Sequence, residues 1–319
     1  MIKVIYHCYG GSHSSVTTAG IHLGLLPWDR IPNASEILQV PHFDGNEPIA
    51  HGHFRLIGYD YAGNEVYVLG KRTLGRNVTC LLQKVAQIIG CSHALYPVDT
   101  TAPVNLLMIF GGFLSRGLKL APLGRPLVIL GTQLAYFRFV QLADQVEENL
   151  RKRNKEQLSS LEQIPTPRVV FYICPQDFRL ALLTAGFHLY SEAPDDFVLE
   201  WALEQKQFSG EIGTISYLGS HEGHDLYLVG AAGEPQIVAR TLRELRNLLR
   251  VSRADWYVVE SHLTPSLFYR GVALFFKLLG WRKAIRFFEK RVFRKLIHAC
   301  RHEGYRVKAS LKDGVLDET

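Results

Sequence analysis

Residues 3–22 of the chain are KVIYHCYGGSHSSVTTAGIH, an apolar run, then a turn rich in glycine and serine, then a run of small and apolar residues. The branched apolar run at 3–7 predicts a buried strand. Val16, Ala19 and Leu23 have helical spacing, so they predict a helix with one packed face. The stretch is typical of the strand, loop and helix that begin an α/β domain.

The same pattern returns 166 positions further along the chain. Eight of the twenty residues at 4–23 are identical to their counterparts at 170–189, where chance would give about one. Cys8, for example, corresponds to Cys174. A later block repeats at an offset of 160 and pairs Gly63, Tyr67 and Gly70 with Gly223, Tyr227 and Gly230.

This repeat predicts two tandem α/β domains, at residues 1–150 and 169–319, joined by a charged linker at 151–168. The second copy is expected to be degenerate. In each copy, strands that alternate with helices indicate a mostly parallel, doubly wound-type sheet with an antiparallel hairpin. In the first copy we expect strands at 3–7, 54–59, 65–70, 93–98 and 126–130, and later helices at 75–90 and 133–150.

The composition agrees with a globular protein. The chain has 319 residues, of which 47% are hydrophobic and 21% are charged. Its N-terminus lacks the basic region, long apolar stretch and small-residue cleavage site of a signal peptide, so we expect a cytoplasmic protein. The five cysteines include no CxxC pair, which argues against a disulfide scaffold and a thiolate zinc site.

The turn at residues 8–15 is the strongest candidate for chemistry. It follows the carboxyl end of a strand, where α/β sheets bind ligands, and it precedes a helix. Free N–H groups and the helix dipole attract phosphate, sulfate or a carboxylate there, and they lower the pKa of a neighbouring thiol such as that of Cys8. The alternative is a capped helix over a buried Cys8. The expected ligand-binding residues are Gly10, Gly11, Ser12, Ser14, Ser15, Lys71 and Arg72.

Turnover at this site would use Cys8 as the nucleophile. The candidate acids are Asp99, at the end of another predicted strand, and His13, in the turn itself. Asp99 has a simpler alternative role as the cap of the turn that follows it. The expected partner is a phosphorylated small molecule or a nucleotide. The sequence names no cofactor, does not decide between binding and turnover, and does not set the oligomeric state.

The second copy lacks this polar set. Loss of its glycines, hydroxyls and cations together favours one joint anion site in the first copy, while independent drift of exposed residues is the alternative. Gly10, Gly11, Ser14 and Ser15 correspond to Gln176, Asp177, Leu180 and Ala181, and Lys71 and Arg72 correspond to Ala231 and Ala232.

The turn resembles the loop of the low-molecular-weight tyrosine phosphatases, in which a strand leads into Cys, five residues, Arg and Ser. Cys8, Gly10 and Ser15 match that pattern, but Ser14 stands where the arginine would be. A serine has neither the charge nor the forked donors that grip a phosphoryl group, so ordinary phosphatase activity is not expected. A nucleotide-binding P-loop is a weaker comparison because the lysine is missing.

Three motifs of the first half also resemble a bacterial family of uncharacterised domains. They are YHCYGGSHSS at 6–15, PHFD at 41–44 and GNEVYVLG at 63–70. The resemblance covers about the first 150 residues and implies a cytoplasmic single-domain relative without an assigned activity.

Histidines offer an alternative, metal-dependent hydrolase hypothesis. His51 and His53 would point the same way on a strand, and His42, Asp44, His13 and Cys8 could complete the ligand set. No spacing signature supports this set. His22 and His188 occur in both copies on the packed helix, where a structural hydrogen bond is the better explanation.

The positive charge is concentrated near the C-terminus. Residues 267–306 contain eleven Lys or Arg and two Glu, whereas the whole chain has a net charge of +6. Apolar residues at Ile285, Phe288, Val292, Leu296 and Cys300 predict an amphipathic helix. Its aromatic residues favour peripheral binding to an anionic membrane surface over nucleic acid. The simpler interpretation is a terminal helix that packs on the second domain, and a non-catalytic interaction protein is the rival function.

Overall fold

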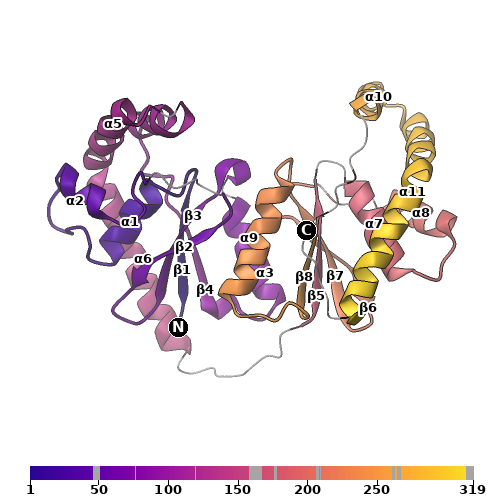
Figure 1. Ribbon diagram of the computed structural model, residues 1–319, viewed down its shortest axis with the longest axis horizontal. Coiled ribbons are helices and arrows are strands. Elements are labelled where there is room, and N and C mark those ends of the chain that lie inside the picture. The colour runs from indigo at the N-terminus through magenta and orange to yellow at the C-terminus, as the bar shows by residue number, and fades with distance from the viewer. Residues whose placement is uncertain are drawn as a thin grey trace. The chain divides into compact units, whose positions relative to one another are not determined.

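The computed structural model describes residues 1–45, 51–75, 77–118, 120–157, 167–175, 178–205, 208, 210–260, 263 and 267–313. The chain divides into two compact units, Met1–Pro165 and Thr166–Thr319 (Figure 1). The helix α6 (Tyr136–Gln157) continues into the expected linker, so regular structure of the first unit extends beyond residue 150.

The first unit is built on a four-stranded sheet in the order β2-β3-β1-β4. Its strands are β1 (Lys3–Cys8), β2 (Phe54–Tyr59), β3 (Glu65–Gly70) and β4 (Leu95–Asp99). The central strand β1 pairs in parallel with β3 and β4, and β2 closes an antiparallel hairpin with β3. The hairpin strands have the predicted bounds, and the fold class is confirmed.

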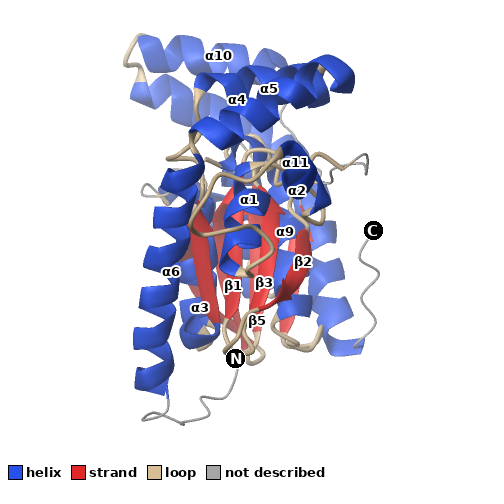
Figure 2. Cartoon of the chain, turned by 90° about the vertical axis from the view of Figure 1, so that its left-hand side faces the viewer, coloured by secondary structure: helices blue, strands red, loops and turns tan. Residues whose placement is uncertain are grey.

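Helices cover both faces of this sheet, which explains the apolar composition of β1. Val4 and Tyr6 belong to the core that includes residues of α1 (Ser14–His22) and α6. His7 points to the opposite face, where its Nε2 lies 2.8 Å from the Thr79 hydroxyl of α3 (Asn77–Ile88). Figure 2 shows α1 in front of the strands.

The remaining elements of the first unit lie outside the sheet. A short helix, α2 (Ala34–Gln39), begins with a capping box between Asn33 and Glu36. Two 3₁₀ turns and a helical layer after β4 complete the unit: η1 (Arg72–Leu74), η2 (Ser92–Ala94), α4 (Leu106–Gly112), the π-helical η3 (Phe113–Gly117) and α5 (Ala121–Leu134).

The prediction of a strand at 126–130 was wrong, because this run lies inside α5. A short apolar run does not distinguish a strand from a buried helix. Here the run is helical because α5 packs closely on α4. The two helices approach so closely at Gly124 that a Cβ there would lie 2.5 Å from the Gly111 carbonyl oxygen. Gly131 and Thr132, which follow this run, are also helical, and the helix expected at 133–150 is α6.

The second unit repeats the sheet in the order β6-β7-β5-β8. Its strands are β5 (Val169–Cys174), β6 (Ile215–His221), β7 (His224–Gly230) and β8 (Trp256–Glu260). Its helices are α7 (Phe178–Leu189), α8 (Asp195–Glu204), α9 (Pro235–Leu248), α10 (Leu267–Leu278) and α11 (Arg282–Asp313).

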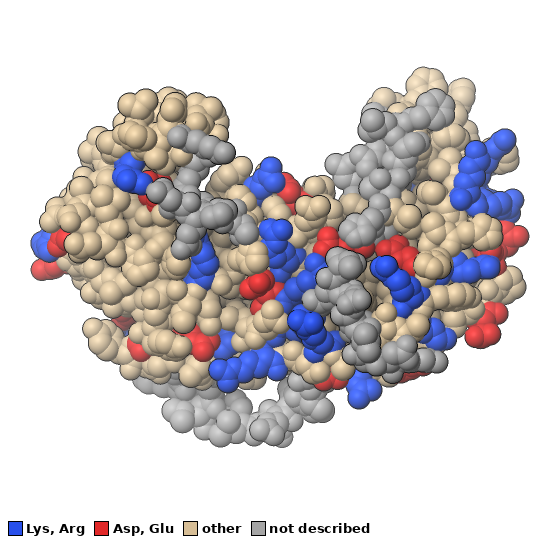
Figure 3. All heavy atoms as spheres, in the orientation of Figure 1, with Lys and Arg blue, Asp and Glu red and all other residues tan. Residues whose placement is uncertain are grey.

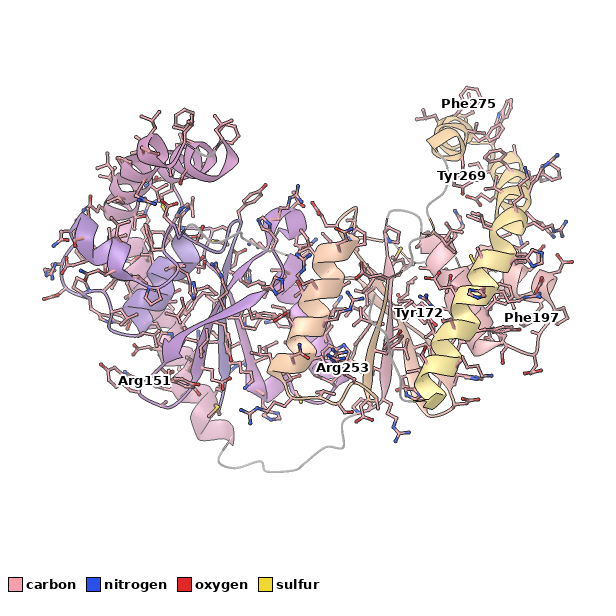
Figure 4. All side chains as sticks on the ribbon, viewed as in Figure 1. Arg151, Tyr172, Phe197, Arg253, Tyr269 and Phe275 are labelled. Atoms are coloured by element: carbon pink, nitrogen blue, oxygen red, sulfur yellow. The ribbon has the colours of Figure 1, made fainter. Side chains whose placement is uncertain are left out.

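An interior hydrogen bond is the same in both units. The Tyr6 hydroxyl lies 2.7 Å from His22 Nδ1, and the Tyr172 hydroxyl lies 2.7 Å from His188 Nδ1. Tyr172 points from β5 towards α7 (Figure 4). The structural role predicted for both histidines is confirmed. Both hairpins also shift register at the same place, before Gly58 and before Gly219.

The basic C-terminal helix α11 packs on α7, as the simpler interpretation of that segment expected. Its buried side chains include Phe293, Ile297 and Cys300, which belong to the core of the second unit. Among the described residues, no single helix is long and apolar enough to cross a membrane. Among these residues, only the consecutive helices α5 and α6 taken together have the length and the apolar composition of a membrane span, and the angle between them is 62°.

The buried histidine of the second unit should make stability depend on pH. Burial, together with the charges of His221, His224 and Lys308, lowers the pKa of His188 to about 3. In the unfolded chain its pKa is about 6.5, so the unfolded state binds the proton first as the pH falls. We expect stability to fall by about 1.4 kcal/mol per pH unit below about pH 6.5 from this group. Urea unfolding at several pH values measures the slope.

The matched variants are His188→Gln and His298→Gln. His188→Gln should lower stability at neutral pH, since Tyr172 loses its partner, and should also flatten the pH slope. His298 lies exposed on α11, so His298→Gln should leave the slope unchanged. Equal slopes in wild type and His188→Gln would contradict the prediction.

Candidate functional site

The candidate site lies where β1 passes into α1. The strand ends at Cys8 and the helix begins at Ser14, with residues 9–13 between them. The first turn of α1 contains no acidic residue, and within the described part of the chain the His13 side chain does not cap the helix. The positive end of the helix dipole therefore faces the turn.

The sulfur of Cys8 occupies this turn. The Gly11 backbone N–H donates a hydrogen bond to Sγ over 3.1 Å, and the Ser15 hydroxyl oxygen lies 3.2 Å from Sγ. The cysteine is only 5% exposed. Its sulfur thus lies among N–H and hydroxyl groups at a helix N-terminus, a kind of position that attracts anions in proteins generally.

These donors change the acidity of the thiol. Burial raises the pKa of Cys8, but hydrogen bonds from Ser15, Ser14 and the Gly11 N–H outweigh that effect, so the pKa is lower than usual. The Ser15 contribution comes from both its hydroxyl and its backbone N–H. Since the thiolate is the nucleophilic form of cysteine, this environment favours reactivity.

The backbone of the turn needs glycine at position 11. Gly11 has a φ of +69°, in the left-handed region that disfavours other residues, and a Cβ there would lie 2.5 Å from the Gly70 nitrogen. The turn therefore rests directly on the end of β3. In this backbone conformation the Gly11 N–H points towards the Cys8 sulfur.

Three serines of the turn differ in their partners. Ser14 Oγ lies 3.1 Å from the Thr100 hydroxyl, which donates in turn to the His7 carbonyl oxygen. Ser15 contacts Cys8. Ser12 is 1% exposed, and its hydroxyl has no hydrogen-bond partner among the described residues. An unsatisfied buried hydroxyl costs about 1–3 kcal/mol, so Ser12 is a candidate ligand donor.

Lys71 and Asp99 form an ion pair beside the turn. Lys71 Nζ lies 2.8 Å from an Asp99 carboxylate oxygen, and the Lys71 backbone N–H donates to the Cys8 carbonyl oxygen. Burial raises the pKa of Asp99, but hydrogen bonds from Lys71 and Thr101 bring it below its ordinary value. Asp99 is therefore ionised at neutral pH and caps the following turn through Thr101, as its simpler alternative role expected.

The neighbouring His7 is held neutral. Burial and the positive charge of Lys71 lower the pKa of His7 to about 3, although Asp99 opposes the shift. Its Nδ1 lies 4.0 Å from the Asp99 carboxylate and is buried without a hydrogen-bond partner among the described residues. The sequence hypotheses did not include His7, because its position in an apolar run indicated only a strand.

His13 is held by a buried carboxylate. Its Nε2 lies 3.2 Å from Asp44, which also accepts hydrogen bonds from the Ser115 hydroxyl and from Arg125 Nε. The Asp44 backbone N–H donates to the Ser12 carbonyl oxygen. The PHFD motif thus docks on the turn through Asp44, which the sequence had suggested only as a metal ligand.

Arg55 is a cation at the site that sequence reasoning missed. It projects from β2, is half-buried and donates from Nη2 to the Gly11 carbonyl oxygen. A comparison of the two copies could have indicated it. Arg55 lies opposite Val68 in the first hairpin, and Ser216 lies opposite Leu228 at the equivalent position of the second. The second copy has therefore lost this cation too. By contrast, Arg72 is exposed, and its backbone N–H donates to the Tyr9 carbonyl oxygen.

The described residues contain no cluster of possible ligands that would support the metal-dependent hydrolase hypothesis. Within the described residues, no three His, Cys, Asp or Glu side chains are grouped so that they could hold a metal ion. His51 and His53 do not share a strand face as expected, because β2 begins only at Phe54. His42 lies in a turn with a φ of 67°.

The second unit repeats one backbone hydrogen bond of this site in the part of the chain that the structure describes. The Ala231 N–H donates to the Cys174 carbonyl oxygen, as the Lys71 N–H does to that of Cys8. Cys174 Sγ lies 3.7 Å from the Pro175 carbonyl oxygen. Leu180 and Ala181 are buried in α7, whereas Gln176 and Asp177 lie outside the described residues.

The fold and the site define a duplicated α/β protein in which the first unit carries a hydrogen-bonded cysteine at the start of a helix. The chain belongs to the family described as protein of unknown function (DUF3189), whose model matches residues 3–148 and again residues 169–300. Both halves are thus copies of one domain, as the repeat predicted. No curated protein and no solved structure matches the chain.

The donors around Cys8 lead to a test of thiol acidity. Ser15→Ala removes the hydroxyl contact, so the pKa of Cys8 should rise. Thiolate absorbance in the ultraviolet, followed against pH with Cys8→Ser as the blank, measures it. Ser92→Ala, on the exposed η2, is the matched control and should leave the titration unchanged. A Cys8 titration that is the same in Ser15→Ala and wild type would contradict the assignment.

Proposed function

We propose that the first unit binds the phosphate group of a small molecule or nucleotide at the turn of residues 8–15. The observation that carries this proposal is the convergence of a buried thiol, hydroxyls and N–H groups at the N-terminus of α1. Such groups attract anions, and α1 gives them no acidic residue in its first turn. The unpartnered Ser12 hydroxyl supports a ligand contact.

Positive charge at the site comes from two directions in this proposal. Arg55 reaches Gly11 from β2, and Lys71 lies at the end of β3. The Asp99 carboxylate offsets much of the Lys71 charge. Arg55 brings a second cation to the turn. A guanidinium has forked donors that suit phosphate oxygens. In the phosphatase loop an arginine supplies a positive charge and forked donors, and Ser14 has neither. Arg55 would supply both from another strand.

Turnover, if the bound group reacts, would use the Cys8 thiolate. The sulfur would attack phosphorus, the bond from phosphorus to the leaving oxygen would break, and that oxygen would need a proton. Asp99 is ionised at neutral pH and does not suit the donor role. Between the two candidate acids, His13 is the better one, because Asp44 orients its ring.

The rival proposal assigned a partner or membrane surface to the basic segment from residue 267. Several cations of α11 are paired with acids of α8 in the same unit. Arg286 and Lys290 contact Glu200, and Arg294 contacts Asp196. These pairs reduce the charge available to an anionic partner, so α11 supports this proposal less than its sequence suggested.

The anion proposal is tested by thermal shift with inorganic phosphate, sulfate and nucleotides. A ligand at about 100 times its dissociation constant adds about 2.7 kcal/mol to native-state stability. Wild type should show a raised melting temperature with one anion class. Ser14→Ala combined with Ser15→Ala should abolish the shift, because both hydroxyls and their effect on Cys8 are lost.

A charge variant separates electrostatics from the hydroxyl contacts. Arg55→Gln should weaken anion binding by about tenfold, the order of one charge-assisted hydrogen bond. Arg151→Gln removes an exposed cation of α6 and should leave the affinity unchanged. Equal anion affinity in wild type, the double serine variant and Arg55→Gln would refute the proposal.

A further inference from the structure

The helical layer after β4 exposes an unusual amount of apolar surface. Six large apolar side chains of this layer, called here the apolar cap, are each at least 56% exposed. A soluble surface rarely gathers so many in one place without a partner. The apolar cap consists of Leu106, Ile109 and Phe110 of α4, Phe113 of η3, and Leu123 and Leu134 of α5.

The face in Figure 3 agrees with this distribution, since the described side chains at the top of the first unit, around α5, are mostly uncharged. Two shallow hollows run along α5 and extend the apolar surface. One is lined by residues that include Pro126, Ile129 and Leu130, and the other includes Leu134 and Phe137. The Cys8 turn is not part of either hollow.

The charge of this segment has one sign. Between Asp99 and Asp144 the sequence contains four Lys or Arg and no Asp or Glu. Arg138, at the start of α6, is exposed. Arg125, in contrast, forms an ion pair with the buried Asp44. Exposed apolar side chains in a segment of net positive charge complement an anionic lipid surface.

The second unit has a segment of the same kind at the same place in its fold. After β8, the 28 residues at 261–288 include five Lys or Arg and no Asp or Glu. Phe275 and Leu278 of α10 are 56% and 78% exposed, and Phe275 lies at the outer end of the unit (Figure 4). This pattern has survived in both copies, although the polar groups of the Cys8 site have not.

We propose that α4, η3 and α5 of the first unit dock on the surface of an anionic lipid bilayer. The apolar cap enters the boundary between headgroups and acyl chains, and the cations of the segment meet lipid phosphates. A second copy of the chain is a poorer occupant, because a contact between two copies of this segment would bring cations together with no acid of the segment to pair with them. The layer would lie on the bilayer surface, since none of its described helices is by itself long and apolar enough to cross a membrane.

The experiment is co-sedimentation of the full-length protein with lipid vesicles. Wild type should bind vesicles of phosphatidylcholine that contain about a third phosphatidylglycerol, should bind pure phosphatidylcholine weakly, and should lose binding as salt is raised. The variant with Leu106→Ser, Leu123→Ser and Leu134→Ser changes three of the most exposed side chains of the apolar cap. Its binding should fall by about tenfold or more, because lipid affinity scales with buried apolar area.

The matched control carries Leu25→Ser, Tyr59→Ser and Tyr61→Ser, three exposed residues of the same unit away from the apolar cap. It should bind like wild type. Circular dichroism checks the fold of each variant, and Leu106→Ser alone should lower binding by about threefold if the triple variant melts early.

Three outcomes would overturn the proposal. One is no binding of wild type to anionic vesicles. Another is equal binding by wild type and the triple variant, since attraction by charge alone, for example through α11, would survive loss of the leucines. The third is self-association that the triple variant abolishes without any vesicle binding, which would assign the surface to a second copy.

Discussion

The central strand of each unit is buried on both faces and paired on both edges. β1 lies between β3 and β4, and β5 lies between β7 and β8. A strand in this position is mostly apolar, and sheets of this kind bind ligands beyond the carboxyl ends of their strands. The turn after Cys8 is therefore where the first unit can present polar groups. The buried pairs Tyr6–His22 and Tyr172–His188 tie each following helix to its strand.

The comparison of the two units separates what the fold needs from what the site needs. Gly70 and Gly230, the buried tyrosines and the histidines belong to the scaffold and are present in both copies. Around Cys8 the first unit adds hydroxyls and cations that the second lacks. Because the backbone hydrogen bond from residue 71 to Cys8 persists as that from residue 231 to Cys174, the scaffold does not depend on those groups. Their presence in one unit is most simply explained by the anion site proposed above.

The sequence correctly predicted the elements that are determined by neighbouring residues in the chain. The hairpin strands 54–59 and 65–70 have the observed bounds, since an Ala-Gly-Asn turn between apolar runs is a strong local signal. It failed at 126–130, where the Gly111–Gly124 contact packs two helices together and overrides an apolar run that suits a strand. At the site, Gly11, Ser14 and Ser15 surround the Cys8 sulfur. Arg55, and the bond from Asp44 to His13, were missed because both arrive from distant parts of the chain.

The sequence by itself determined the duplication, the α/β class and the position of the turn at the end of the first strand, because periodicity and repetition are properties of the order of residues. The tertiary structure decided which side chains meet there. It paired Lys71 with Asp99, oriented His13 through Asp44 and left the Ser12 hydroxyl buried without a partner among the described residues. It also showed that the cations of α11 face acids of α8, while the apolar side chains of α4 and α5 face outwards. These outcomes depend on contacts between residues far apart in sequence, which local patterns do not encode.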